Sequence, residues 1–387
     1  MLDYSTDAVQ PGSPEELAEA MGCAAGRGQS IHLGGHFSKR LMGGPVAPAD
    51  LTISTAAMSC VRQYEPRDLT ISVEAGISYC ELSRVLAEHR QMIPLDPPFS
   101  DTATIGGILA ANCSGPRRRL YGTARDMVIG MRFATLEGKL VDSGGMVVKN
   151  VAGLDMSKMM IGSFGTLAAI AVVNFKLIPQ PHCERTFGLA FPGLDEAIAA
   201  RDAILKSALQ PAALDLLNPA AAELETPAYT LVVQAGGNAA VLERYERELA
   251  AMGGHPMRPG ADAAFWRAIH NLTPRYLEAN PDGAVVRVSC TLKQLKAIMQ
   301  SVPGPAIARA GSGVCYAYFE NAGEAACFAA STARDYSGTV VEFAPEDRKS
   351  RLNLWPSPGP DLDLMRRIKH MFDPRSLLNR GRLYGHI

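Results

Sequence analysis

The stretch Leu33–Arg40 has the sequence LGGHFSKR and directly follows an apolar run, SIHL, that predicts a short β-strand. Two glycines after a strand permit a tight turn and a close approach of the backbone to a ligand, so consecutive N–H groups can surround a phosphate. The spacing matches neither the Rossmann G-x-G-x-x-G loop nor the Walker loop. Taken alone, the stretch fits an ordinary turn as well as a phosphate loop.

Alternating helix and strand patterns surround this loop. Before it, Ser13-Pro14-Glu15-Glu16 is typical of a capped helix start and predicts a helix to about Ala25. After it, residues 68–76 alternate like a strand, and residues 78–89 place Leu82, Val85 and Leu86 on one helical face.

The following segment adds a hairpin that turns at Glu137-Gly138, a short helix near 154–161 and a strand near 168–178. Pro179 and Pro181 end this region and predict a domain boundary.

A second glycine segment, Ala103–Gly115, has the sequence ATIGGILAANCSG. Its Gly106-Gly107 pair would let a ligand approach the backbone, although a small-residue helix packed against a neighbour explains it equally well. The next residues, PRRRLYGTARD, carry four arginines before Asp126. Such a run is usually a solvated face, but next to the glycines it makes Arg118 and Arg125 candidates for holding a phosphate or a partner.

A third glycine segment, Gly144–Asp155, has the sequence GGMVVKNVAGLD. Lys149 and Asn150 stand between apolar residues, where a lysine is often a surface residue with a buried stem. The same pair could instead stabilise negative charge on a reduced flavin or a carboxylate substrate.

The middle third of the chain alternates helices near 194–208 and 239–252 with strands near 230–234, 285–290 and 339–343. Its pattern suggests a duplicated, split β-α-β-β-α unit, although any α+β domain shows some alternation. A last helix ends near Phe372, before Asp373-Pro374. We therefore predict an α+β protein with three parts: domain 1–181, a ferredoxin-like cap domain 182–350, and a C-terminal segment 351–387.

The bulk composition limits the classes of function. The net charge of −1 excludes the basic field typical of nucleic-acid binding. None of the eight cysteines forms a Cys-x-x-Cys pair, which argues against a metal site or an iron–sulfur cluster on this chain. The acidic N-terminus is unlike a signal peptide, and the longest aliphatic run is too short to span a bilayer. We expect a cytoplasmic protein, with peripheral membrane association through a partner left open.

The order and spacing of several motifs carry a family resemblance. The glycine loop near residue 35 is followed by DPPF and ATIGG near 97–107, YG and RD near 121–126, KNVAGLD at 149–155, IGSFGTL at 161–167 and the tail LNRGRLY. Together they resemble the vanillyl-alcohol-oxidase/PCMH-type FAD-binding family, and within it the FAD-binding subunits of bacterial glycolate oxidases. The resemblance is dense over residues 30–180, recurs at 370–387, and implies FAD extended between two α/β subdomains.

The resemblance also implies residue roles. For the FAD pyrophosphate and its neighbourhood it implies Gly34, Gly35, His36, Phe37, Ser38, Lys39, Pro98, Thr104, Ile105, Gly106 and Gly107. For the adenosine and ribityl path it implies Asn112, Gly115, Tyr121 and Gly122, with Arg118 beside them. For the adenine it implies Val128 and Ile170, and for the isoalloxazine Asn379 and Arg382, with Lys149 and Asn150 as further candidates.

Two residues depart from the family pattern, and the histidines bear on the chemistry. The usual tyrosine of KNVxGYD is Leu154, and the usual proline of the tail NPGR is Arg380. His36 follows two glycines, as does the histidine that carries covalent flavin in some relatives, but the following FSK matches the glycolate-oxidase subunits, so we expect non-covalent FAD. His255 and His270 are isolated and no histidine occurs in 285–345, so no general base is nominated.

These features predict an FAD-dependent oxidoreductase, namely the FAD-binding subunit of a glycolate dehydrogenase complex that oxidises glycolate, or D-lactate, to the 2-oxo acid. The expected partners are a homologous FAD-containing subunit and an iron–sulfur subunit that receives the electrons. Two alternatives remain: a self-sufficient FAD-dependent oxidoreductase acting on another alcohol or hydroxy acid, and a non-catalytic assembly subunit that keeps the fold.

Overall fold

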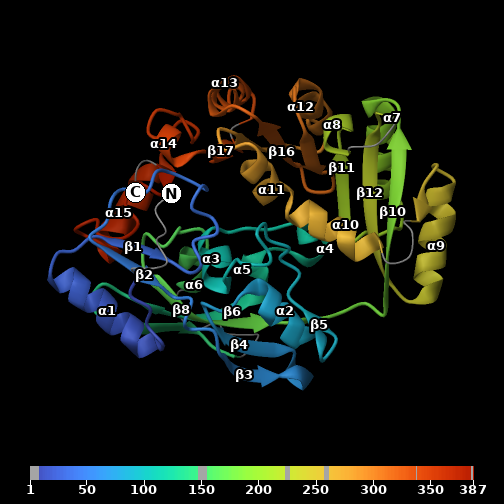
Figure 1. Cartoon of the computed structure of the whole chain (residues 1–387). Coiled ribbons are helices and arrows are strands. Elements are labelled where there is room, and N and C mark those ends of the chain that lie inside the picture. The colour runs from blue at the N-terminus through green and yellow to red at the C-terminus, as the bar shows by residue number, and fades with distance from the viewer. Residues whose placement is uncertain (1–7, 147–154, 223–226, 257–260, 337, 385–386) are drawn as a thin grey trace. The chain divides into compact units, whose positions relative to one another are not determined.

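The computed structural model describes residues 8–146, 155–222, 227–256, 261–336, 338–384 and 387. The chain divides into two compact units (Figure 1). The first unit comprises Met1–Ser114, Thr123–Gln180 and Ser357–Ile387, and the second comprises Gly115–Gly122 and Pro181–Pro356. The sequence predicted boundaries at 181/182 and 350/351, and it did not indicate that Gly115–Gly122 groups with the second unit.

The first unit contains two main sheets. Strand β1 (Ile31–Gly34) pairs in parallel with β2 (Leu51–Ser54). An antiparallel sheet has the order β3-β4-β8-β6-β7, and the short β5 pairs with β9. The bounds of these strands are β3 Val61–Glu65, β4 Thr70–Glu74, β5 Gln91–Met92, β6 Val128–Ala134, β7 Leu140–Gly144, β8 Ala169–Lys176 and β9 Ile178–Pro179.

Helix α1 (Pro14–Gly26) begins as its sequence predicts. The Ser13 hydroxyl accepts from the Glu16 N–H at 3.1 Å, and Pro14 occupies the first helical position. Leu17 and Met21 are buried beside Ile31 and Ile53, so α1 and the β1–β2 pair share one core. The other helices of this unit are α2 Tyr79–Ala87, α3 Ile105–Ala110, α5 Ala124–Met127, α6 Ser157–Met160 and α15 Asp361–Phe372, with a 3₁₀ turn at Pro66–Asp68.

The second unit is built from two similar halves, which confirms the duplication suggested by the sequence. The first half runs β10 Cys183–Phe191, α7 Leu194–Lys206, β11 Ala213–Leu217, α8 Pro219–Ala222, β12 Tyr229–Gly237, α9 Ala239–Ala250 and β13 His255–Pro256. The second half runs β14 Ala284–Ser289, α12 Leu295–Ser301, β15 Ala306–Arg309, β16 Val314–Phe319, α13 Ala322–Thr332 and β17 Gly338–Phe343. Helices α4 (Arg118–Tyr121), α10 (Ala261–His270), α11 (Leu272–Ala279) and α14 (Glu346–Lys349) complete the unit.

The two halves form one antiparallel sheet of order β13-β10-β12-β11-β15-β16-β14-β17. Each half has the strand order of a split β-α-β-β-α-β unit, and the halves meet where β11 pairs with β15. The sequence analysis missed α10 and α11, which link the halves.

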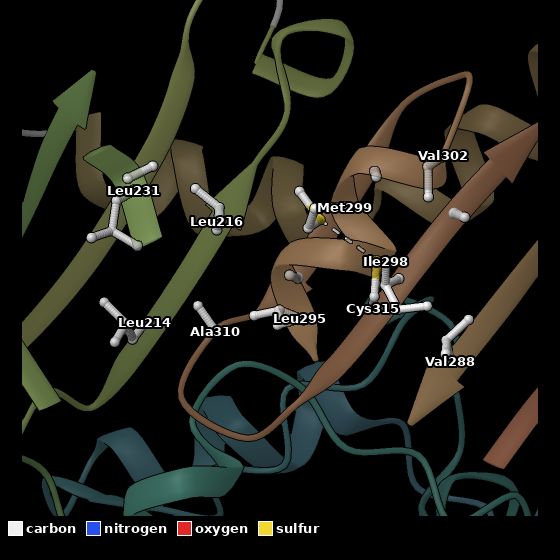
Figure 2. Close-up of a cluster of buried hydrophobic side chains, with 14 of the residues drawn as sticks. Leu214, Leu216, Leu231, Val288, Leu295, Ile298, Met299, Val302, Ala310 and Cys315 are labelled. Atoms are coloured by element: carbon white, nitrogen blue, oxygen red, sulfur yellow. Dashed lines mark hydrogen bonds between the residues drawn. The ribbon is translucent and has the colours of Figure 1, made fainter. Parts of the chain in front are cut away.

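One face of this sheet carries a large apolar core. Side chains of α12 pack over Leu214 and Leu216 of β11 and over Cys315 of β16, whose sulfur lies 3.7 Å from that of Met299 (Figure 2). The alternation of strand residues sends every second side chain to this face. The helices therefore cover the face that the apolar residues define.

The opposite face of the sheet carries polar pairs. The indole N–H of Trp266 on α10 donates to the Thr186 hydroxyl at 2.9 Å. At the junction of the halves, Asp215 of β11 stands opposite Arg309 of β15 and forms an ion pair with it. The Asp215 side chain is fully buried and that of Arg309 is 12% exposed, so the pair holds the two halves in register at the cost of desolvating both charges.

We predict that Asp215→Ala lowers the free energy of unfolding by about 3–5 kcal/mol, because it leaves the guanidinium buried without its carboxylate. Urea titration followed by circular dichroism measures the change. Asp195→Ala is the matched control: Asp195 also pairs with a cation, Lys296, but is 72% exposed, so a loss of at most about 1 kcal/mol is expected. Equal losses for the two variants would contradict the role given to the buried pair.

Candidate functional site

The turn after β1 directs its backbone N–H groups away from β2. The carbonyl of Gly34 accepts from the Thr55 N–H at 2.9 Å, and the carbonyl of Gly35 accepts from the Ser54 hydroxyl at 2.9 Å. In a trans peptide the N–H lies opposite the carbonyl. The N–H groups of Gly35 and His36 therefore point to the side of the turn that does not face β2.

Within the part of the chain that the structure describes, the N–H groups of Gly35, His36, Ser38 and Lys39 donate to no protein acceptor. Phe37, between them, has a φ of 52°, in the left-handed region that non-glycine residues rarely adopt. A left-handed residue in a turn bends successive N–H groups toward one point and forms an anion-binding concavity. The turn thus offers several unused donors to a ligand.

The two glycines of this turn are required by packing. A Cβ on Gly35 would lie 2.2 Å from the hydroxyl oxygen of Thr104, and a Cβ on Gly34 would lie 2.4 Å from the Phe37 ring. Thr104 caps α3, where its hydroxyl accepts from the Gly107 N–H at 3.3 Å. The Gly-Gly pair therefore lets the turn press against the start of α3.

The N–H groups at the start of α3 are already used within the protein. The Ile105 N–H donates to the Ile77 carbonyl at 2.9 Å, and the Gly106 N–H donates to the Ala75 carbonyl at 2.7 Å. A Cβ on Gly106 would lie 2.9 Å from the Cβ of Ala75. A ligand could therefore approach the backbone of this segment closely but would find its first N–H groups already bonded. The segment agrees with the small-residue helix packed against a neighbour that the sequence analysis considered.

The C-terminal tail returns to β1 and extends it. The Ile31 N–H donates to the Leu377 carbonyl at 2.8 Å, and the Asn379 N–H donates to the Ile31 carbonyl at 3.0 Å. The Asn379 side chain accepts from the Leu33 N–H at 2.7 Å and donates to the carbonyls of Leu33 and Phe164 at 3.1 and 2.8 Å. Its amide therefore joins β1, the 163–166 loop and the tail.

Arg382 fixes the far side of the turn. Its guanidinium donates to the carbonyls of Arg40 and Lys39 at 2.9 and 3.2 Å, and lies 5.7 Å from the centre of the Phe164 ring. Arg382 is only 9% exposed, and with two hydrogen bonds and one ring contact its side chain has little conformational freedom. Arg382 thus holds the glycine turn in place from the tail.

A buried ion pair anchors the tail itself. The ammonium of Lys369 on α15 lies 2.6 Å from the carboxylate of Asp373 and also donates to the carbonyls of Thr166 and Leu378 at 2.7 and 3.2 Å. The same carboxylate accepts the N–H groups of Leu377 and Leu378. Burial lowers the pKa of the Lys369 amine, and Asp373 opposes this shift.

These elements enclose a cavity of about 790 Å³, its open mouth included, within the first unit. Its walls bring together many of the residues predicted from the sequence: Gly34, Gly35, His36, Phe37, Ser38, Lys39, Thr104, Gly106, Gly107, Ile170, Asn379 and Arg382. The remaining lining residues were not predicted: His32, Leu33, Arg40, Thr55, Ala110, Ala111, Phe164, Gly165 and Ala168. Phe164 and Gly165 belong to the IGSFGTL motif, which marked the segment without indicating individual residues.

Other predicted residues do not line this cavity. Pro98, Ile105, Asn112 and Val128 lie in the first unit but outside the cavity walls. Four more belong to the second unit: Gly115, Arg118, Tyr121 and Gly122. Lys149 and Asn150 are outside the described residues. The roles in FAD binding expected for these residues remain predictions.

Asn112 has a structural role that its sequence context did not reveal. Its φ is 50°, its N–H donates to the Leu109 carbonyl at 3.0 Å, and the Cys113 N–H donates to the Ile108 carbonyl at 3.1 Å. This pair of bonds is the Schellman motif that ends a helix, here α3, with a left-handed residue for which asparagine or glycine is preferred. Because its side chain is exposed, backbone conformation accounts for the residue type.

His36 is positioned by one hydrogen bond. Its Nδ1 lies 2.8 Å from the Thr102 carbonyl and must donate to it, so a neutral ring carries its lone pair on Nε2. Among the described residues, no group of three or more histidine, cysteine, aspartate or glutamate side chains is arranged to hold a metal ion.

The donor set fits a nucleotide diphosphate. Unused N–H groups line the turn, and a buried lysine lies in the same wall of the cavity. FAD carries such a diphosphate, so the residues present are compatible with the cofactor that the motifs implied.

We predict that Asn112→Gly leaves stability and flavin content unchanged, whereas Asn112→Ala costs about 1–2 kcal/mol, because alanine resists the left-handed conformation. Thermal unfolding and the flavin-to-protein absorbance ratio measure the two properties. Loss of flavin from a stably folded Asn112→Gly variant would show instead that the side chain contacts the cofactor.

Comparison with known proteins agrees with this site. Residues 7–144 match the FAD binding domain family, and residues 357–383 match the C-terminal domain family of FAD linked oxidases. The second match contains α15, Asn379 and Arg382, the tail elements that close the cavity. No described helix is long and apolar enough to cross a membrane.

Three curated relatives are similar over part of their length. The chain is 38% identical to glycolate oxidase subunit GlcE of Escherichia coli over 151 residues, which are 38% of this chain and 42% of the relative. It is 30% identical to glycolate oxidase subunit GlcD of Bacillus subtilis over 161 residues, 42% of this chain and 34% of the relative. It is 31% identical to the mitochondrial D-lactate dehydrogenase (cytochrome) of Arabidopsis thaliana over 212 residues, 54% of this chain and 37% of the relative.

These alignments span less than half the length of each relative. Among solved structures, 4-ethylphenol oxidase from Gulosibacter chungangensis has a TM-score of 0.73 at 15% identity, covering 97% of this chain and 88% of that one. At this identity the likeness concerns the fold alone. The chain thus shares the fold of this oxidase, and two of its segments match the FAD binding domain family and the C-terminal domain family of FAD linked oxidases.

Proposed function

We propose that FAD binds in the cavity of the first unit with its diphosphate on the Gly35–Lys39 turn, and that the protein takes part in oxidising a small 2-hydroxy acid. The observation that carries the proposal is the set of N–H groups of Gly35, His36, Ser38 and Lys39, which have no acceptor among the described residues and lie in the wall of the cavity. Backbone donors fixed before the ligand arrives bind phosphate without reorganisation.

Each part of the site has a defined task in this proposal. The turn and the first residues of α3 hold the diphosphate, and the tail keeps the turn in place through Asn379 and Arg382. FAD, when bound, supplies the acceptor for the two electrons released by the substrate. The protein contributes binding and orientation, and no described residue is nominated as the general base.

The substrate class follows from the relatives. The glycolate oxidase subunits and the D-lactate dehydrogenase act, by their names, on glycolate and D-lactate. Both substrates are 2-hydroxy acids, and we extend this class to the present chain, with glycolate as the first candidate.

We further propose that this chain is one subunit of a complex, with a homologous FAD-containing subunit and an iron–sulfur subunit as partners. Two relatives are named as subunits of glycolate oxidase. The sequence has no histidine in 285–345 and no Cys-x-x-Cys pair, which fits a chain that relies on partners for substrate chemistry and for onward electron transfer. Such a complex would work in the cytoplasm, at the inner membrane surface if its acceptor is there.

The departure at Arg380 does not favour loss of FAD binding. Arg380 is exposed and its guanidinium donates to the Pro48 carbonyl, while its own carbonyl accepts the Ala47 N–H at 3.2 Å. Arg380 therefore joins the tail to the segment after β1 through two hydrogen bonds.

An absorption spectrum of the purified chain tests the proposal, alone and co-expressed with its genomic neighbours, before and after glycolate is added. We expect flavin bands near one equivalent, and bleaching by glycolate only in the co-expressed complex. Bleaching of the chain alone would replace the subunit proposal with the self-sufficient enzyme. A colourless protein in both preparations, which does not take up added FAD, would refute FAD binding at this cavity.

We predict that Gly35→Ala weakens FAD binding at least tenfold, because the new methyl group would overlap the Thr104 side chain and displace the turn that carries the donors. Fluorescence titration of the flavin-free protein measures the dissociation constant. Gly26→Ala is the matched control, since a Cβ there meets no atom within 4 Å. Equal affinities of the two variants would place the diphosphate elsewhere.

A further inference from the structure

Lys39 is a buried cation without a counter-charge from the protein. The residue is 8% exposed and lies in the wall of the cavity. Among the described residues, no carboxylate is within ion-pair distance of its ammonium and no acceptor forms a hydrogen bond with it, and the ammonium nitrogen keeps some contact with the open space of the cavity. An isolated buried charge is costly, so such a group normally has a partner or loses its proton.

A second buried lysine in the same unit shows the contrast. Lys369 is 6% exposed, but its ammonium has the carboxylate of Asp373 at 2.6 Å and two carbonyl acceptors. The fold thus supplies a full set of partners to one buried lysine and none to the other. The missing partner of Lys39 is therefore expected from outside the chain.

The groups around Lys39 are not anionic carboxylates. The titratable group that interacts with its ammonium is the thiol of Cys113, which follows α3. The guanidinium of Arg382 donates to the Lys39 carbonyl from the tail, and Arg40 and His36 are the other titratable residues of the turn. The cation therefore faces a weak acid and further basic groups.

Burial lowers the pKa of the Lys39 amine below its ordinary value, and Cys113 opposes this shift only in part. The free protein thus holds this proton less tightly than a solvated lysine does. Negative charge brought into the same cavity acts in the opposite direction and favours the ammonium form.

We propose that Lys39 supplies the counter-charge to the phosphates of the bound flavin nucleotide and takes up one proton from the solvent when the nucleotide binds. This inference rests on the proposed function, in that it places FAD in the same cavity. The proton balance is simple: at a pH above the lowered pKa of the free protein, the neutral amine takes one proton from the buffer to give the ammonium ion, and no other bond changes.

The sign of the resulting pH dependence is fixed. Between the lower pKa of the free protein and the higher pKa of the complex, the complex binds one more proton than its components do. The affinity for FAD therefore falls as the pH rises through this window, by up to about tenfold per pH unit. Riboflavin carries no phosphate, so its binding should cause no proton uptake and show no such slope.

Isothermal titration calorimetry of the flavin-free full chain tests the proposal. FAD is titrated at several pH values, each in two buffers of different ionisation enthalpy, because the difference in heat between the buffers counts the protons taken up. We expect up to one proton per FAD and none per riboflavin. These wild-type measurements are decisive whether or not any variant folds.

The variants Lys39→Met and Lys139→Met test whether Lys39 is the group that takes up the proton. Lys39→Met should lose the proton uptake and the pH slope for FAD, while binding riboflavin as the wild type does. Lys139 is 71% exposed in the turn between β6 and β7, so Lys139→Met makes the same charge change and should retain both properties.

The outcomes separate the two proposals. FAD binding without proton uptake and without a pH slope overturns the role of Lys39 and leaves the proposed function intact. Proton uptake that persists in Lys39→Met also overturns that role, because another group then accepts the proton. Failure of both FAD and riboflavin to bind refutes the proposed function itself.

Discussion

The cavity depends on the docking of the C-terminal tail against β1. Residues 377–379 pair with Ile31 as a neighbouring strand would, and the Asn379 amide bonds to the backbone of Leu33, 346 residues away in sequence. The Lys369–Asp373 pair fixes the tail, because the Lys369 ammonium donates to the Thr166 carbonyl and the Asp373 carboxylate accepts the Leu377 N–H. Removing any of these contacts would expose unpaired backbone groups in the core, which is why the tail composition is polar in a buried place.

The polar residues of the site differ in whether their polar groups are bonded within the protein. The side-chain amide of Asn379 and the guanidinium of Arg382 donate to protein carbonyls, and these bonds hold the turn in place. The φ of Phe37 lies in the left-handed region, which is consistent with a conformation kept for binding. Lys39 differs from Asn379 and Arg382, since its ammonium has no counter-charge among the described residues.

Much of the architecture could be read from local patterns. The N-terminal capping residues, the hairpin at Glu137-Gly138 and the strand predicted near 168–178 are confirmed by α1, by the β6–β7 pair and by β8. The duplicated cap follows from repeated helix and strand lengths and is confirmed by the sheet order. Helices α10 and α11 lie between the two repeats and were missed; Trp266 and Ile269 of α10 pack there on apolar strand residues such as Val232.

The type and order of most elements and the positions of the glycine turns could be predicted from the sequence, because these depend on periodicity and on residues adjacent in the chain. Only the tertiary structure decided what individual polar residues do. It showed that Asn112 ends a helix, that the amides of Ile105 and Gly106 are already paired, and that Lys39 has no counter-charge while Lys369 has one. The reason is physical. Whether a donor or a charge has a partner depends on residues that folding brings close from distant parts of the chain, and a local sequence pattern does not show which residues these are.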